Sequence, residues 1–364
     1  MAGKKLRVLV VDDTVLYRKA LTDVLARIPN VEVVGSAGNG KIGLNKIEQL
    51  RPDLMTLDFE MPVMDGLQTL RELKKKNSDV AVVMVSAHTS AGAAVTMEAL
   101  ELGAYDFIAK PSGGSLEQNR EALLKQLKPV IQSVTTRRIL SRTLRRAPST
   151  PLPQKQAVAI PSPAPSPAVP PKPAGRIDIV AVGISTGGPN ALAVMIPLLP
   201  KTLRVPVVIV QHMPPVFTKA LADSLDKKSV VRVKEAEQGE LIQAGCVYIA
   251  PGGRQMRLAR RAGGIAVELT DDPPENHCRP AVDYLFRSVS KLYDNRAMGV
   301  IMTGMGSDGV LGLRLMKRRG ARVIGQDKTT CVVYGMPMEA AKAGVVDLVL
   351  PLTRIAPEIV RMVQ

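Results

Sequence analysis

The sequence predicts two α/β domains, each built on a parallel, doubly wound sheet, with an extended tether between them. Short β-branched segments alternate with helical periodicity from Lys5 to about Leu127, which is typical of a parallel sheet covered by helices. The alternation resumes near Arg176 and continues to the end of the 364-residue chain, which is long enough for two or three separate cores. Residues 128–175 between them form a basic linker rich in Pro and Ala. We therefore expect domains at residues 5–127 and 176–364.

The net charge of +16 is unevenly distributed along the chain. Between Ala122 and Ile177 there are ten basic residues and no acidic one, and ten of the 28 prolines lie between Pro148 and Pro173. Such a segment cannot bury enough apolar surface to order itself, so we expect a solvated, semi-extended tether. A weak contact with an anionic surface is the alternative interpretation. The charge thus does not require a nucleic-acid partner, and we expect none.

Composition also bears on the compartment. No apolar segment approaches the roughly 18 residues of a membrane span, and the N-terminus has no hydrophobic signal-peptide core. The three cysteines, Cys246, Cys278 and Cys331, are far apart and form no CxxC pair. A disulfide framework or a zinc site is therefore not expected, and a reducing cytoplasm without membrane insertion fits best.

The first domain is predicted to contain five parallel strands. They are expected at residues 7–11, 31–37, 54–57, 80–86 and 106–109, with helical patterns such as 15–27 and 66–76 between them. Ligands of such sheets bind beyond the carboxyl ends of the strands. The residues at these ends are Asp12, Asp13, Asp58, Ser86 and Lys110.

Three converging carboxylates repel one another unless a cation lies among them, and oxygen ligands suit Mg²⁺. A hard cation there would also neutralise a phosphoryl group on one carboxylate. Lys110 supplies a fixed positive charge, and Ser86 supplies a hydroxyl for a phosphoryl oxygen.

These residues, together with the segment Met61-Pro62-Val63-Met64-Asp65-Gly66, make residues 5–127 resemble the receiver domain of two-component response regulators, a flavodoxin-like fold. The resemblance implies that Asp58 is the phosphoacceptor, that Asp13 and Asp58 hold Mg²⁺, and that a histidine kinase is the phosphodonor. It also places Tyr105 at the position of the family's switch aromatic residue.

The second domain is predicted to be another α/β layer structure. Strands are expected at residues 177–184, 205–211, 230–234, 245–249, 265–269, 297–303, 322–326 and 345–350. Helices are expected at residues 190–199, 218–224, 281–292, 309–319 and 338–343, with a hairpin insertion around 250–265.

A glycine-flanked serine follows the first of these strands. Residues 183–187 match G-x-S-x-G, which permits a sharp strand-to-helix turn with the Ser185 hydroxyl beside the amides of a helix N-terminus. A nucleophilic serine needs a base, and His212 follows directly on the next strand. His277 lies in a proline-flanked loop and is expected to serve helix entry or the substrate site. A purely structural imidazole at His212 is the alternative.

A third strand, at residues 297–303, leads into Gly304-Met305-Gly306-Ser307-Asp308-Gly309. Asp308 is the candidate carboxylate for orienting His212, and it could also cap the following helix. The glycines would let backbone amides point into the site as an oxyanion hole, with the Met305 N–H as the preferred donor. The chain order Ser, His, Asp differs from that of α/β-hydrolases.

The G-x-S-T-G-G turn, the Gln211-His212-Met213 segment and the loop from Thr303 to Gly309 together resemble the protein-glutamate methylesterases of bacterial chemotaxis. The resemblance covers both domains and implies a serine hydrolase of γ-glutamyl methyl esters on chemoreceptors. Methanol would be released, glutamines would be deamidated through the same acyl intermediate, and ester hydrolysis would need no cofactor. It further implies that the unphosphorylated receiver domain covers the active site. The long Pro/Ala-rich tether departs from the family pattern. The departure affects how closely the two domains are expected to dock.

Three other interpretations compete with this one. A DNA-binding response regulator would require a basic helix-turn-helix module, which the strand–helix alternation of the last 190 residues does not supply. Cys278, beside His277, could be the nucleophile in place of Ser185. An inactive scaffold is the third alternative.

Overall fold

The N-terminal domain is a five-stranded parallel sheet. The computed structural model describes residues 5–87, 89–111, 113–146 and 176–363. The strand order is β2-β1-β3-β4-β5, and all four pairings are parallel. The strands are β1 (Leu6–Val11), β2 (Val31–Ala37), β3 (Leu54–Asp58), β4 (Ala81–Ser86) and β5 (Asp106–Ala109). The five expected strands are therefore confirmed.

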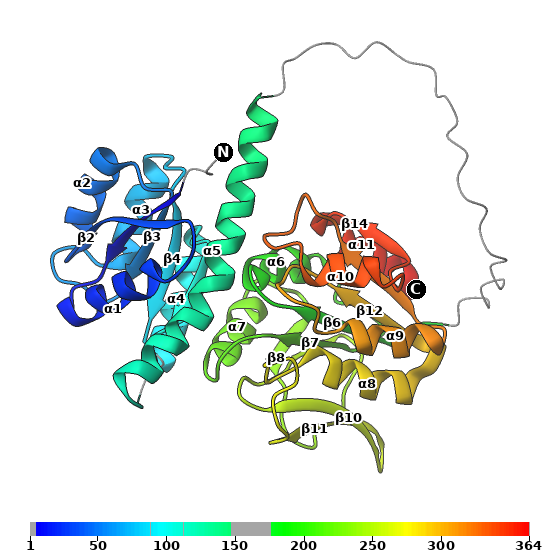
Figure 1. Ribbon diagram of the computed structural model, residues 1–364. Coiled ribbons are helices and arrows are strands. Elements are labelled where there is room, and N and C mark those ends of the chain that lie inside the picture. The colour runs from blue at the N-terminus through cyan, green and yellow to red at the C-terminus, as the bar shows by residue number, and fades with distance from the viewer. Residues whose placement is uncertain (1–4, 88, 112, 147–175, 364) are drawn as a thin grey trace, which may run out of the picture.

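Helices cover both faces of this sheet (Figure 1). One face packs against α1 (Val15–Ala26) and α5 (Leu116–Arg146), and the other against α2 (Gly40–Leu50), α3 (Gly66–Lys75) and α4 (Ser90–Leu102). Burial on both sides explains why strand β3 is buried at all five positions rather than alternating.

Helix α5 departs from the sequence prediction. It continues past residue 127 to Arg146, so residues 128–146 are helical and not part of an extended tether. The reason is amphipathic packing, because Val130, Ile131 and Val134 are buried against the sheet. The tether expected for residues 147–175 lies outside the described residues.

The C-terminal domain contains a seven-stranded sheet of order β14-β13-β12-β6-β7-β9-β8, parallel at every pairing. Its strands are β6 (Ile179–Ile184), β7 (Val207–Gln211), β8 (Arg232–Glu235), β9 (Cys246–Ile249), β12 (Ala297–Ile301), β13 (Arg322–Gln326) and β14 (Leu348–Leu350). The expected hairpin is confirmed as an antiparallel pair of β10 (Gln255–Arg261) and β11 (Gly264–Thr270). Strand β14 begins later than predicted, because its pairing with β13 starts only at Ile324 and Leu348.

Helices lie on both faces of this sheet as well (Figure 1). Helices α8 (Val282–Tyr293) and α9 (Val310–Arg318) pack on one face, and α6 (Gly188–Met195), α7 (Phe217–Asp226) and α11 (Leu352–Val363) on the other. Helix α10 (Met336–Lys342) and the short 3₁₀ turns η1 (Ile196–Leu198) and η2 (Asp294–Arg296) complete the domain. Within the described ranges no helix is long and apolar enough to cross a membrane.

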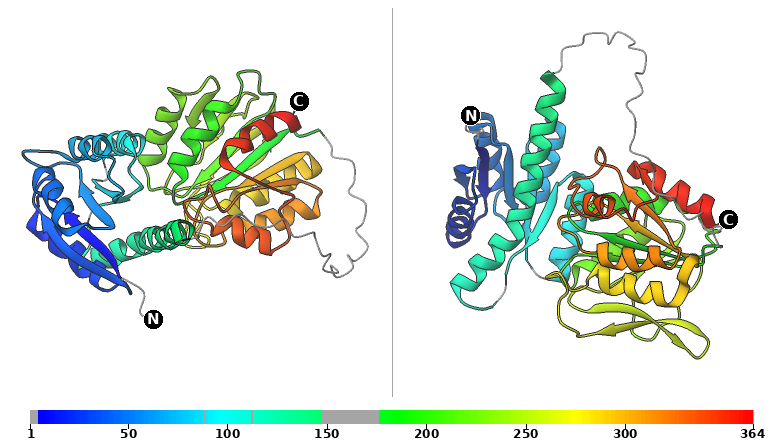
Figure 2. Two further views of the ribbon diagram at one scale, coloured as in Figure 1. Left: turned by 90° about the horizontal axis from the view of Figure 1, so that it is seen from above. Right: turned by 45° about the vertical axis from the view of Figure 1, so that its right-hand side comes forward.

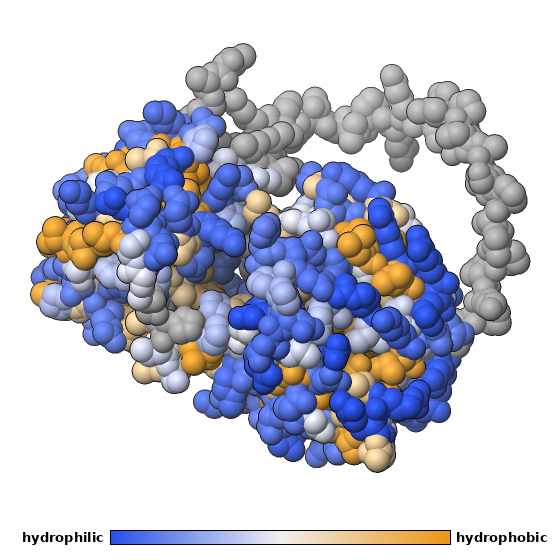
Figure 3. Space-filling view, turned by 60° about the horizontal axis from the view of Figure 1, so that its bottom comes forward, coloured by the Kyte–Doolittle hydropathy of each residue, from blue (hydrophilic) through white to orange (hydrophobic). Residues whose placement is uncertain are grey.

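Helix α4 of the first domain packs against α6 and α7 of the second, and Figure 2 shows the two domains side by side. Phe107 stacks on Phe217 with ring centroids 4.7 Å apart. Glu101 forms an ion pair with Lys228 and accepts a hydrogen bond from the Ser224 hydroxyl. The Asn190 side chain donates to the Ala104 carbonyl. A face of the whole molecule is mostly hydrophilic, with hydrophobic residues in small separate groups (Figure 3).

Candidate active site

Ser185 lies in a tight turn between β6 and α6. Its N–H donates to the Thr303 carbonyl at 2.9 Å, and its carbonyl accepts the Gly188 N–H at 2.7 Å. Gly187 has a φ of 74°, which favours glycine, and a Cβ on Gly188 would overlap the Gln211 side chain. Gly187 and Gly188 are therefore required by the turn itself. The Ser185 side chain in this turn is half-buried.

His212 lies beside Ser185 because their strands are neighbours. Ile184 pairs with Gln211 in the parallel register, and the His212 N–H donates to the Ile184 carbonyl at 3.2 Å. Neighbouring strands are about 4.8 Å apart, so the residues that follow Ile184 and Gln211 are adjacent at the sheet edge. The Gln211 side chain donates to the Ser185 carbonyl at 3.0 Å and so braces the serine turn, a contact that the sequence did not predict.

Asp308 binds the imidazole of His212. Its Oδ2 is 2.8 Å from Nε2 of His212, and it is buried to 3% exposure. The N–H groups of Val282 and Asp283 donate to the same carboxylate at 2.7 and 3.0 Å. Because these are the first amides of α8, Asp308 caps α8 and not the helix that follows it in sequence.

Asn276 is a further ligand of this carboxylate, through Nδ2 at 2.9 Å. Burial raises the pKa of Asp308, but the hydrogen bond and charge of His212, with the two backbone amides, lower it further, so that the net shift is downward. Asp308 is thus held ionised. Neither Asn276 nor the α8 amides were predicted, since they lie 25 or more residues from Asp308.

The other ring nitrogen of His212 faces Cys278. Nδ1 is 3.6 Å from the Cys278 Sγ. Burial lowers the pKa of His212, but hydrogen bonds to Asp308 and Cys278 raise it more, to about 9. Within the described part of the chain, the Ser185 hydroxyl has no hydrogen-bonding partner.

The loop after β12 lies directly against the serine. A Cβ on Gly304 would lie 2.8 Å from the Ser185 Cβ, so only glycine permits this approach. The Gly304 carbonyl accepts the N–H groups of Gly335 and Met336, which fixes the loop. Met305 is 40% exposed, and its N–H has no acceptor among the described residues. His277, by contrast, is exposed in its loop and makes no hydrogen bond there to another described residue.

The carboxyl edge of the N-terminal sheet holds a second cluster. The Lys110 Nζ is 2.7 Å from Asp58 and 3.0 Å from Asp12, and carboxylate oxygens of Asp12, Asp13 and Asp58 lie within 4.8 Å of one another. Burial raises the pKa of Asp58 to about 6, although Lys110 lowers it. An all-oxygen set of this kind fits Mg²⁺.

Ser86 ends β4 at this edge, whereas Tyr105 precedes β5 at the opposite, amino edge, where its N–H donates to the Val82 carbonyl. The Ser86 hydroxyl donates to the Gly92 carbonyl of α4 at 3.1 Å. The Tyr105 hydroxyl is 2.6 Å from that of Ser133, and the ring is buried.

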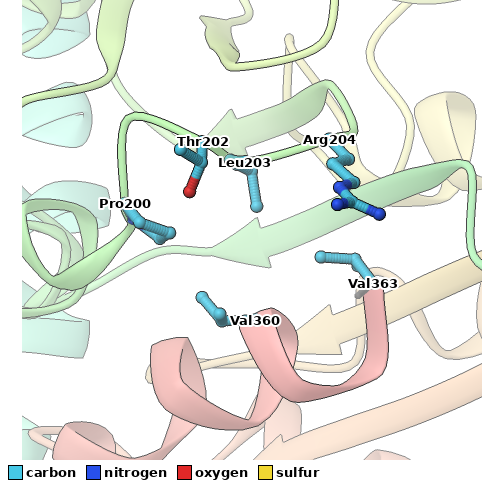
Figure 4. Close-up of a pocket in the computed structure, with 6 residues that line it drawn as sticks. All are labelled: Pro200, Thr202, Leu203, Arg204, Val360 and Val363. Carbon is cyan, nitrogen blue, oxygen red and sulfur yellow. The ribbon is translucent and has the colours of Figure 1, made fainter.

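A separate small groove is lined by residues of the loop before β7 and by the end of α11 (Figure 4). Its residues are Pro200, Thr202, Leu203, Arg204, Val360 and Val363. The loop lies at the amino end of β7, opposite to Ser185 and His212, so this groove is not part of the candidate site.

Comparisons with known proteins agree with the two-domain fold. Residues 180–359 match the family model of the CheB methylesterase, and residues 8–121 match that of the response regulator receiver domain. Proteins named protein-glutamate methylesterase/protein-glutamine glutaminase are 50% identical in Desulfotalea psychrophila and 45% identical in Bacillus subtilis, each over 99% of both chains. The crystal structure of the Thermotoga maritima CheB methylesterase catalytic domain aligns with a TM-score of 0.50 and 44% identity, covering 51% of this chain and 99% of that one.

Proposed function

Because the chain belongs to the CheB methylesterase family and carries a receiver domain, it is a protein-glutamate methylesterase and protein-glutamine glutaminase, and we propose that Ser185, His212 and Asp308 perform both reactions. The observation that carries the proposal is the parallel register of β6 and β7, which makes Ser185 and His212 neighbours, together with the 2.8 Å contact between His212 and Asp308. The substrates that we propose are glutamyl methyl esters and glutamines on the cytoplasmic part of chemoreceptors, so that the reaction takes place in the cytoplasm.

The hydrogen bond to Asp308 assigns the base nitrogen. With Nε2 donating to the carboxylate, Nδ1 of His212 accepts the proton as the Ser185 Oγ attacks the ester carbonyl. The tetrahedral oxyanion accepts a hydrogen bond from the Met305 N–H. The imidazolium then protonates the leaving group, which departs as methanol from an ester or as ammonia from a glutamine. Water activated by Nδ1 hydrolyses the glutamyl-serine ester and releases the enzyme. This sequence uses only side chains and backbone amides.

Cys278 is the competing nucleophile, since its Sγ already lies 3.6 Å from Nδ1. Ser185 is favoured because it adjoins the Gly304–Met305 loop, which supplies the oxyanion donor. Ser185→Ala should lower methanol release from methylated receptors by at least about 1,000-fold, whereas Cys278→Ala should retain most of it. Thr186→Ala, which removes the neighbouring hydroxyl, is the matched control. A near-normal rate for Ser185→Ala would remove the assignment.

The receiver cluster supports regulation by phosphorylation. We propose that Asp58 accepts the phosphoryl group from a histidine kinase, with Mg²⁺ held by Asp13 and Asp58, and that the charge of Lys110 pairs with the phosphoryl oxygens. When bound, Mg²⁺ would neutralise charge on the transferred group. The Ser86 hydroxyl must leave the Gly92 carbonyl to reach a phosphoryl oxygen, and Gly92 belongs to α4, which packs against the catalytic domain. Phosphorylation would thereby weaken docking.

The fragment 176–364 tests this regulation. It should hydrolyse ester faster than the unphosphorylated full-length chain, and a small phosphodonor with Mg²⁺ should raise the rate of the full chain only. Asp58→Asn in the full chain is the control that should abolish the response. If the fragment and the unphosphorylated full-length chain hydrolysed ester at equal rates, the proposal that the receiver domain inhibits the esterase would be contradicted.

A further inference from the structure

Cys278 is held against the base nitrogen by a structured loop. The Glu275 and Cys278 backbones exchange two hydrogen bonds, at 3.1 and 2.7 Å. The fully buried Gln255 side chain donates to the Cys278 carbonyl at 3.4 Å. The thiol itself is half-buried, so solutes can reach it. These bonds fix the Cys278 backbone, and the thiol also lies 3.5 Å from the Asn276 carbonyl, so the loop itself holds Sγ on the side of His212.

The spacing of the two atoms is that of a metal-ligand pair. In a tetrahedral zinc site with Zn–S near 2.3 Å and Zn–N near 2.05 Å, sulfur and nitrogen are separated by about 3.5 Å. The observed Sγ–Nδ1 distance is 3.6 Å. Cys278 and His212 could thus share a tetrahedral ion without movement of either backbone.

The opposite side of the imidazole is arranged as in many zinc proteins. A histidine ligand usually donates its second N–H to a carboxylate, which fixes the ring and the tautomer. Asp308 does this at 2.8 Å from Nε2, and it is itself held by the amides of α8 and by Asn276. Atoms of His212, Cys278 and Asp308 all lie within 4.8 Å of one another.

We propose that Cys278 Sγ and His212 Nδ1 bind a thiophilic divalent cation, Zn²⁺, which reversibly blocks the esterase. The ion replaces the thiol proton, which is released to solvent, and two waters complete the tetrahedron. Sulfur and imidazole donors distinguish this site from the all-oxygen receiver cluster, which suits Mg²⁺. Ion binding does not depend on the proposed function, but the block does, because it occupies the nitrogen assigned as the base.

Binding is tested with Co²⁺ as a spectroscopic substitute, in the full-length chain with excess Mg²⁺ to occupy the receiver carboxylates. A thiolate-to-cobalt charge-transfer band should appear, and Zn²⁺ should bleach it. Cys278→Ser should abolish the band, His212→Gln should weaken the affinity at least tenfold, and Cys331→Ser, the other half-buried cysteine, should leave it unchanged. A band that survives Cys278→Ser, or an affinity unaffected by His212→Gln, would overturn the site.

Inhibition is measured by methanol release, with each variant compared with its own zinc-free rate. Zn²⁺ should inhibit the wild-type chain, a chelator should restore the rate, and Cys278→Ser should raise the half-inhibiting concentration at least tenfold. Equal sensitivity in wild type and Cys278→Ser would contradict the proposal. A cobalt band without inhibition by Zn²⁺ would overturn only the proposal that the bound ion blocks the esterase. The rate of the Ser185→Ala variant tests the esterase assignment separately.

Discussion

At His212, the two ring nitrogens have different neighbours, and this difference defines the chemistry of each. Asp308 takes Nε2, so that Nδ1 is left to exchange protons with the nucleophile. The Asp308 carboxylate also accepts the first amides of α8. One buried side chain therefore orients the base and caps a helix, which makes it important for both activity and stability.

The Asp308→Asn variant tests both roles, because it keeps the size of the buried side chain but removes its charge. An amide can still fill the space, but it cannot hold the His212 tautomer or accept as many N–H groups, so we expect kcat to fall about 1,000- to 10,000-fold and Tm to decrease. Asp283→Asn is the comparison, because Asp283 is an adjacent buried acid that accepts the Gly312 N–H and shares Asn276 with Asp308 but forms no hydrogen bond with His212. It should lose stability but little kcat. If Asp308→Asn lowered Tm but left kcat unchanged, Asp308 would cap helix α8 but would not orient His212.

The pH dependence of hydrolysis should report the neighbours of His212. Its pKa is raised to about 9, so the imidazole is protonated and unable to accept a proton at neutral pH. We expect kcat/KM to rise with pH up to about 9. Cys278→Ser removes an interaction that raises this pKa and should move the profile to lower pH. A profile that is flat between pH 6 and 9 would contradict this assignment.

At the scale of the element, the strand-to-helix turn and the loop after β12 interlock through glycines. Gly304 lies so close to Ser185 that any side chain would push the two apart, and Gly187 needs its positive φ to start α6. These glycines are thus determined by the close approach of two backbones.

Gly304→Ala should therefore impair catalysis more than folding. Its Cβ would meet Ser185 and Met336, displacing the nucleophile from the oxyanion donor, and a displacement of about 1 Å can cost about 100-fold in rate. Methanol release and thermal unfolding should be measured together. Gly306→Ala is the comparison within the same loop, because nothing lies within 4 Å of its Cβ position, although its φ of 87° strains any side chain. Equal rate losses in the two variants would argue against steric displacement.

At the scale of the whole molecule, the receiver domain sits on the helices that follow the two catalytic strands. Burial raises the pKa of Asp106 in β5 to about 6, although the Phe107 N–H, which donates to this carboxylate at 2.9 Å, and the Gly187 backbone across the domain contact lower it. Since Gly187 belongs to the serine turn, docking reaches the edge of the active site.

The Glu101–Lys228 ion pair gives a direct test of this docking. Both side chains are about one third exposed, so the pair contributes at most about 1 kcal/mol, and Glu101→Lys should raise basal activity by up to about fivefold. Lys228→Glu should act in the same direction, and the double exchange should restore the low basal rate. Additive activation in the double variant would exclude a specific contribution from this pair.

The sequence by itself determined the two sheets and the strand ends at which Ser185, His212, Asp308 and Asp58 lie. This was possible because the alternation of buried strands and amphipathic helices is local, and because parallel strands bring their carboxyl ends to one edge. Only the tertiary structure decided that Asp308 binds Nε2, that Cys278 faces Nδ1, that α5 extends to Arg146 and that α4 docks on α7. The contacts at His212 join residues 66 and 96 positions apart, and the domain contacts join residues over 80 apart. Packing between separate elements sets such distances, and no local periodicity encodes them.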